Sequence, residues 1–312
     1  MTTEDTQYAH QPVMLEEVLD MWFSQSEGFY VDGTFGRGGH SRALLSHLGA
    51  NGRLTGIDRD PQAIAAGQQL AASDSRFHMM ASRFDCLPQA VEQAGRPIDG
   101  LLLDLGVSSP QLDDAARGFS FLRDGPLDMR MDPTQGESVA EWLSYAAEKD
   151  IANVLYRYGE ERKSRWIAKR ICETRKEQPI TRTLQLADLI ESVLGRNEQG
   201  KHPATRSFQA LRIHINGELD ALDQVLEQSL ETLAIGGRLA IISFHSLEDR
   251  IVKLFIRDHS GRAPKGRGGL PLGDELPQRL EPVGKAMRAS KAELKVNVRS
   301  RSAVLRIAEK VA

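Results

Sequence analysis

The chain has only two cysteines among its 312 residues, Cys86 and Cys172. They can build neither a disulfide framework nor a Cys-x-x-Cys metal site. No apolar run approaches the roughly 18–20 residues that a membrane span needs, and the polar start of the chain resembles no secretory or transit signal. These absences predict a cytoplasmic protein with no membrane partner.

Two common nucleotide-binding motifs are also missing. No Gly-Lys-Ser/Thr follows a glycine-rich loop, which argues against a Walker A phosphate site. A G-x-G-x-x-G motif that starts at Gly36 and Gly38 would need a third glycine where the chain has Ser41. A nicotinamide-dependent oxidoreductase is therefore disfavoured, although it stays open as a second enzyme class.

A glycine-rich turn follows the short apolar segment 29–32, which we expect to be a strand. The segment ends in Asp32, and four glycines follow within seven residues, Gly36, Gly38 and Gly39 among them. A second predicted strand, 53–58, ends in Asp58, twenty positions after Gly38. An acid at this offset suits the two hydroxyls of a ribose, so the pair predicts a cofactor that contains adenosine.

S-adenosylmethionine suits these residues best, because it carries an ammonium, a carboxylate and a sulfonium but no phosphate. Asp32 can help to hold the cationic methionine end, while backbone amides of the loop around Gly36 meet the carboxylate. Asp58 takes the ribose hydroxyls, and Phe84, after the third predicted strand, can cover the adenine. The residues favour a methyltransferase.

The apolar patterns predict an α/β fold. Strands over 29–32, 53–58, 77–80 and 98–105 alternate with helices, and strands return over 236–244 and 303–308. Between them, 108–212 shows only loops and helices, and 205–233 reads as one long helix or as two divided at Gly217. We expect a discontinuous core (1–107 and 213–312), a helical insert (108–212) for substrate recognition, and a flexible basic loop over 257–297.

The net charge of −3 is unevenly distributed. Residues 259–301 hold ten Lys/Arg and four Asp/Glu, and residues 155–182 hold nine and four. Two such basic segments in an acidic chain predict a nucleic-acid surface, or else solvated helix faces and a loop. A non-enzymatic RNA-binding assembly factor is the third hypothesis.

The sequence resembles a known family along almost its whole length. The similar blocks are 10–14, 30–41, 56–61, 104–113, 118–121, 125–132, 158–162, 202–210, 243–250 and 297–307. Through these blocks the chain is similar to the bacterial 16S rRNA (cytosine(1402)-N(4))-methyltransferase family, also called RsmH or MraW.

The resemblance implies a class I S-adenosylmethionine-dependent methyltransferase with a Rossmann-like sheet and a helical insert. Its substrate would be 16S rRNA in the small ribosomal subunit rather than DNA, methylated at the exocyclic N4 of one cytidine. The cofactor site that the resemblance implies holds Gly38, Gly39, His40, Asp58, Phe84, Asp104 and Gln111. It leaves a homodimer open.

The catalytic residues are harder to predict. Many amino-methyltransferases place Asn/Asp-Pro-Pro-Tyr/Phe after the fourth strand, where this chain has Asp104 and Leu-Gly-Val-Ser-Ser. Asp104 and His245 are the candidates to accept the N4 proton, although a cofactor contact for Asp104 and a helix-entry role for His245 stay open. We expect no metal site, because the acids of 113–132 fit no EF-hand spacing and have arginines nearby.

Overall fold

The computed structural model describes residues 12–195, 202–261 and 277–312. The chain divides into two compact units, unit 1 (1–106 and 220–312) and unit 2 (107–219). The predicted insert, 108–212, lies inside unit 2. No helix within the described ranges is long and apolar enough to cross a membrane.

Unit 1 contains all eight strands of the described chain. They are β1 (Phe29–Asp32), β2 (Arg53–Asp58), β3 (Phe77–Ala81), β4 (Ile98–Asp104), β5 (Leu233–Ser243), β6 (Leu280–Pro282), β7 (Met287–Arg288) and β8 (Val304–Lys310). They form one sheet in the order β3-β2-β1-β4-β5-β8-β6, and β7 pairs with β8. The first five strands are parallel, and β8 is antiparallel to β5. The carboxyl ends of β1, β2, β4 and β5 therefore meet at one edge, where ligands of open α/β sheets bind.

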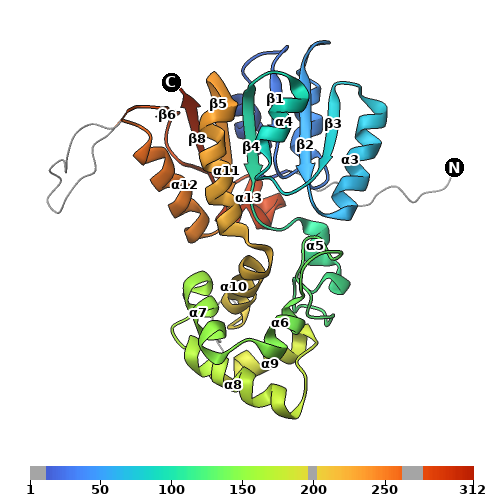
Figure 1. The fold of residues 1–312 in the computed structure, drawn as a ribbon, viewed down its shortest axis with the longest axis vertical. Coiled ribbons are helices and arrows are strands. Elements are labelled where there is room, and N and C mark those ends of the chain that lie inside the picture. Colours follow the sequence, from blue (N-terminus) through green and yellow to red (C-terminus); the bar gives the residue numbers. More distant parts are fainter. Residues whose placement is uncertain (1–11, 196–201, 262–276) are drawn as a thin grey trace, which may run out of the picture. The chain divides into compact units, whose positions relative to one another are not determined.

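Helices cover both faces of this sheet (Figure 1). They are α1 (Leu15–Trp22), α2 (Gly39–Leu45), α3 (Pro61–Ser73), α4 (Leu87–Ala94), α11 (Glu218–Thr232), α12 (Ser246–Asp258), the short α13 (Glu293–Val296) and the 3-10 helix η2 (Val298–Ser302). Helices α4, α11 and α12 pack on one face, with Val31, Leu101 and Leu103. Helices α1, α2 and α3 pack on the other, with Tyr30 and Leu102. The near-continuous apolar sequence of β4 follows from burial on both faces.

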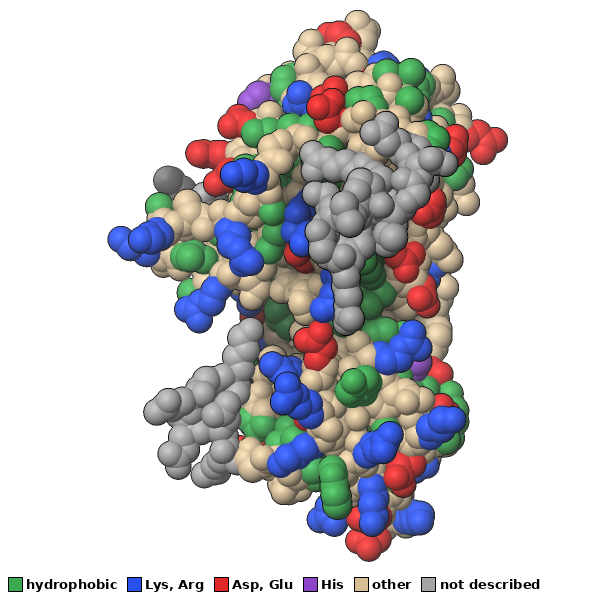
Figure 2. Space-filling model, turned by 90° about the vertical axis from the view of Figure 1, so that its left-hand side faces the viewer, with side chains coloured by type: hydrophobic (Ala, Val, Ile, Leu, Met, Phe, Trp, Pro, Cys, Tyr) green, Lys and Arg blue, Asp and Glu red, His purple; other side chains and the backbone are tan. Residues whose placement is uncertain are grey.

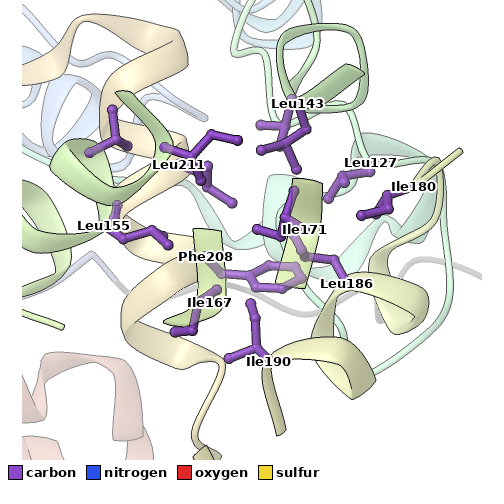
Figure 3. Packing of buried hydrophobic residues seen from close by; sticks show 14 of the residues in the cluster. Leu127, Leu143, Leu155, Ile167, Ile171, Ile180, Leu186, Ile190, Phe208 and Leu211 are labelled. Atoms are coloured by element: carbon purple, nitrogen blue, oxygen red, sulfur yellow. The ribbon is translucent and has the colours of Figure 1, made fainter. Parts of the chain in front are cut away.

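Unit 2 is helical. Its helices are α5 (Ser109–Asp113), η1 (Ala115–Arg117), α6 (Val139–Tyr145), α7 (Glu148–Gly159), α8 (Ser164–Glu177), α9 (Thr183–Leu194) and α10 (Thr205–Asn216). Their apolar faces form a separate core around Ile167, Ile171 and Phe208 (Figure 3). Gly217, with φ of 58°, ends α10 before α11 begins, so the segment 205–233 forms two helices.

One structural prediction is partly wrong. The segment 257–297 was expected to be a loop, yet it contains the end of α12, then β6, β7 and α13. The two strands are short and form because they pair with β8, and β6 buries Leu280 completely. Such pairing depends on tertiary contacts that a local pattern does not carry. Residues 262–276 of this segment lie outside the described residues.

Candidate active site

Asp32 holds the glycine-rich loop at the end of β1. Its side chain is only 2 % exposed. The Ser41 hydroxyl donates to Oδ2 at 2.6 Å, and the Thr34 backbone N–H donates to Oδ1 at 3.2 Å. Burial raises the pKa of this carboxyl to about 6, although both hydrogen bonds favour the ionised form. Asp32 is thus bonded within its own loop and would act on a cationic ligand through its charge.

The glycines of the loop serve two purposes. Gly38 has φ of +75°, and a Cβ there would lie 2.6 Å from Cζ of Phe35. A Cβ on Gly39 would collide with the ring of Pro12. Gly36 also has a positive φ, +55°, but its nearest atom would be the Thr34 carbonyl oxygen at 3.9 Å. Gly38 and Gly39 are therefore required by the packing of the chain itself, whereas Gly36 leaves room for a ligand to approach.

Asp58, at the end of β2, is tied to the same loop. Its Oδ2 accepts the Gly36 N–H at 2.8 Å, and its Oδ1 accepts the Asp60 N–H at 2.9 Å. Burial raises the pKa of Asp58, and these backbone bonds oppose the rise. On the other side of the loop, a Cβ on Gly33 would lie 3.3 Å from Cβ of Phe84. Gly36, Asp58 and Phe84 thus all border one loop, as the sequence predicts.

Asp104, at the end of β4, adjoins this loop through Thr34, whose hydroxyl oxygen accepts the Asp104 N–H at 2.6 Å. Oδ1 of Asp104 is buried and has no hydrogen-bond partner among the described residues. A quarter of the side chain is exposed (25 %). Burial, together with the negative charges of Asp32 and Glu248, raises the pKa of Asp104 to about 8. A buried, unpartnered carboxyl oxygen needs a hydrogen-bond partner that a ligand can supply.

His40 lies beside this carboxyl. Its Nε2 is 3.0 Å from the Val13 carbonyl oxygen, which can only accept, so Nε2 carries the proton. Burial lowers the pKa of His40 to about 4, so the ring is neutral near pH 7. Its Nδ1 is 4.0 Å from Oδ2 of Asp104, beyond hydrogen-bond distance. The side chain itself is buried and bonded within the protein.

His245 follows β5 and is the N-cap of α12. It forms a capping box with Glu248, whose N–H donates to Nδ1 at 3.4 Å while its Oε2 accepts the His245 N–H at 3.3 Å. The same Oε2 also accepts the Phe244 N–H at 2.8 Å. Nε2 of His245 lies 3.1 Å from Oε1 of Glu248 but lacks hydrogen-bond geometry to it or to any other described residue. The helix-entry role is thus confirmed. The buried Glu248 was missed by the sequence reasoning, although its place three residues after His245 is the signal of a capping box.

Gln111 belongs to unit 2, whereas the other predicted site residues belong to unit 1. It is buried, and its side-chain oxygen accepts the Ser108 N–H at 2.9 Å, which completes the capping box of α5. The structure therefore gives Gln111 a role in the start of this helix. Its predicted contact with the cofactor stays a prediction.

The remaining polar candidates of the sequence have structural partners. Asp128 pairs with Arg130 at 2.7 Å, and Asp124 pairs with Arg182 at 2.7 Å. Across the described ranges, no three His, Cys, Asp or Glu side chains gather as metal ligands would. Burial raises the pKa of the Cys86 thiol, which is the opposite of what an attacking thiolate requires.

Sequence comparison decides the family. The profile of the MraW methylase family matches residues 7–311. The chain belongs to the MraW methylase family. It is 98 % identical over 312 residues to the "Ribosomal RNA small subunit methyltransferase H" of Alcanivorax borkumensis, with 100 % of both chains covered. A protein of the same name from Shewanella amazonensis is 57 % identical over 309 residues, which cover 97 % of this chain and 98 % of that one.

Solved structures with similar folds are far more distant in sequence. A putative rRNA-methylase from Clostridium thermocellum is 11 % identical, with a TM-score of 0.43 over 96 % of this chain and 93 % of that one. The N-methyltransferase NodS from Bradyrhizobium japonicum is 10 % identical, with a TM-score of 0.42 over 96 % and 94 %. The match to the MraW methylase family confirms the predicted family and, together with the mostly parallel sheet of unit 1, the predicted class I methyltransferase fold. It gives the oxidoreductase hypothesis no support.

Proposed function

We propose that this protein transfers a methyl group from S-adenosylmethionine to the exocyclic N4 of one cytidine in the 16S rRNA of the small ribosomal subunit. The observation that carries the proposal is the Asp104 carboxyl in a chain of a methylase family. It lies at the ligand-binding edge of the sheet, next to the glycine loop, with one buried oxygen that no described residue satisfies. A homodimer stays a prediction.

The residues of unit 1 fit this cofactor. Gly36 leaves open space where a side chain would stand, so the loop backbone can approach the methionine end. The Asp58 carboxylate is held in place by two backbone N–H groups, and it would accept hydrogen bonds from the ribose hydroxyls. Phe84 offers an apolar surface for the adenine, and the charge of Asp32 favours the cationic end. Gly38, Gly39 and His40 would shape the site by holding this loop.

For this reaction the protein must orient the N4 amine and supply one group that accepts from it. When bound, the cofactor supplies an electrophilic methyl group on a sulfonium. The N4 amine is a weak nucleophile because its lone pair is delocalised into the ring, so it must be held in line with that methyl group. In its ionised form, Asp104 would accept the N4–H hydrogen bond through Oδ1 and take up the proton that N4 loses as it gains the methyl group, and a pKa raised to about 8 makes it a stronger base for this step. The unpartnered Nε2–H of His245 would donate to an acceptor on the same base.

The cysteines favour methylation of nitrogen over C5 of the ring. Methylation at C5 requires a thiolate that attacks C6. Cys86 lies 3.5 Å from Sδ of Met80 with a raised thiol pKa, and Cys172 packs against the core of unit 2. The environment of Cys86 therefore disfavours a thiolate, and a mechanism without a covalent intermediate agrees better with the structure.

The test is to incubate the protein with methyl-labelled cofactor and small ribosomal subunits, then digest the RNA to nucleosides. The proposal expects label in N4-methylcytidine. Label in C5-methylcytidine, or in DNA alone, would overturn it.

The Asp104→Asn variant separates catalysis from cofactor binding. If Asp104 takes up the N4 proton, which the amide of Asn cannot do, kcat should fall roughly 100-fold or more while the Kd for the cofactor changes little. If Asp104 only contacts the cofactor, the Kd for the cofactor should rise and kcat at saturating cofactor should stay unchanged. Asp74, a partly buried acid of unit 1 that pairs with Arg76, gives the matched control Asp74→Asn, which should change neither quantity.

A further inference from the structure

Unit 2 carries a basic groove that the reaction described above does not use. It lies along α8 and is closed by the C-terminal turn of α9. From α8 and its N-cap it is lined by Lys163, Trp166, Lys169, Arg170 and Glu173. In Figure 2, Lys and Arg side chains gather on the lower part of the drawn face, which belongs to unit 2. The lining residues of α8 and its N-cap fall within 155–182, one of the two basic segments of the sequence.

Trp166 is the unusual member of this groove, because its side chain is 68 % exposed. The inner face of α8 is already filled by Ile167, Ala168 and Ile171, all 0 % exposed. Trp166 is thus not needed to dock the helix on the core of unit 2. The other two tryptophans of the chain, Trp22 and Trp142, are 0 % and 7 % exposed. An indole of this size left in water indicates a surface that binds something.

The charges around Trp166 decide what that surface fits. Lys163, Lys169 and Arg170 lie three or four residues from Trp166, so they share its face of the helix. Glu173 is the one acid of the lining, and it lies 3.9 Å from Lys169 in a solvent-exposed pair that contributes little. Lys163 and Arg170 have no acidic partner within the described chain. The groove is therefore positively charged around an aromatic face.

We propose that this groove binds a single-stranded segment of the substrate RNA, with a base stacked on Trp166 and phosphates beside Lys163, Lys169 and Arg170. The inference rests on the proposed function and adds a second contact for its substrate. An aromatic face among cations is the usual platform for unpaired nucleotides. Double-stranded RNA keeps its base faces inside the stack, and protein interfaces are depleted in lysine.

Fluorescence of the full-length protein can test the proposal directly, because Trp166 is the only exposed tryptophan. Titration with single-stranded oligouridine, which contains no cytidine, should quench the emission of the protein. Trp166→Ala lacks the emitting indole, so the affinity of the variants is measured from the anisotropy of fluorescently labelled oligouridine. Trp166→Ala should bind about 10-fold more weakly, as loss of one stacked base predicts. Trp166→Phe keeps a stacking face and should restore most of the affinity. Lys163→Ala should lower the salt dependence of binding by about 0.7 in the log–log slope.

The matched control is Tyr145→Ala in the same unit. Tyr145 is 64 % exposed, but its hydroxyl donates to the carboxylate of Glu137, in an acidic setting. This variant should bind oligouridine as the unaltered protein does. Unchanged oligouridine binding by Trp166→Ala would overturn the proposal. The proposal would also be overturned if Trp166→Ala bound naked RNA normally but small subunits weakly. That result would show that the groove contacts a ribosomal protein.

Methylation of small subunits by the unaltered protein, measured in parallel, separates this proposal from the proposed function. Absence of N4-methylcytidine in that assay would overturn the proposed function but not the proposal for the groove. Loss of oligouridine binding in Trp166→Ala would still support the groove as an RNA site.

Discussion

Oδ2 of Asp58 accepts the backbone N–H of Gly36 at 2.8 Å, and this bond joins the end of β2 to the turn that follows β1. The acid therefore holds the loop, and we expect it to bind the ribose of the cofactor as well. Asp58→Ala should weaken S-adenosylmethionine binding at least 10-fold, since removing a charged hydrogen-bond partner costs about 1.5–3 kcal/mol. Isothermal titration calorimetry measures the loss.

The control for this variant is Glu92→Ala, which removes an exposed acid from α4. It should bind the cofactor as the unaltered protein does. An Asp58→Ala protein with full affinity would show that Asp58 only holds the loop and does not meet the ribose.

Two glycines of the same loop should respond differently to alanine. Gly39→Ala places a methyl group against the ring of Pro12, and such overpacking typically costs about 1–3 kcal/mol of unfolding free energy. Gly36→Ala meets only open space, so its cost is the left-handed backbone, about 1–2 kcal/mol. Its methyl group should obstruct the cofactor instead. Thermal melts with and without cofactor distinguish them.

The expected pattern is that cofactor raises the Tm of Gly39→Ala nearly as much as that of the unaltered protein. It should raise the Tm of Gly36→Ala much less. Equal stabilisation of both variants would contradict the view that the cofactor approaches Gly36.

The buried carboxyls should make the protein less stable as the pH rises toward about 8. Burial raises the pKa of Asp32 to about 6 and that of Asp104 to about 8. Between the unfolded value near 4 and these values, the native state holds protons that the unfolded chain has released. The unfolding free energy therefore falls as the pH rises through this window. His40, with its pKa lowered to about 4, acts oppositely below about pH 6.5.

Asp104→Asn isolates this effect between pH 6.5 and 8.5. Urea unfolding without cofactor should show the variant gaining about 1 kcal/mol or more on the unaltered protein across this range. The gain in unfolding free energy should be smaller than a pKa of about 8 alone would imply, because 25 % of the side chain is exposed to solvent. Asp74→Asn, at a surface acid whose pKa is lowered by Arg76, should give a difference that is constant with pH. A constant difference for Asp104→Asn as well would contradict the raised pKa.

The positions of Asp32, the glycine loop and Asp58 at one edge of the sheet could be predicted because their sequence signals are local. Asp32, the glycines and Asp58 follow strands whose apolar patterns are plain, and parallel strands bring their carboxyl ends to one edge. The contacts of individual residues could not be predicted in this way, because they depend on how the chain packs. Examples are the approach of Gly39 to Pro12 and of Glu248 to His245. Strands β6 and β7 were missed for the same reason, since they depend on β8.

The core of unit 2 supplies the last prediction. Phe208 of α10 is 4 % exposed. The centroid of its ring lies 4.7 Å from that of Phe121, and the two rings are nearly perpendicular. Figure 3 shows the Phe208 ring between Ile171 and Ile190, pointing toward Leu186. Phe208→Ala should lower the unfolding free energy of unit 2 by about 3–5 kcal/mol, because it leaves a cavity in a close-packed core. Leu122→Ala, at a side chain that is 88 % exposed in the same unit, should cost almost nothing.

The two units have separate cores, so the damage should stay in unit 2. The emission of Trp142, which lies in the core of unit 2, should shift at a lower urea concentration in Phe208→Ala. Cofactor binding in unit 1, measured below that concentration, should persist. Methylation of small subunits should then be lost at a lower urea concentration than cofactor binding, because the helical unit is expected to recognise the substrate. Loss of cofactor binding in step with the Trp142 transition would instead show that the two units unfold as one.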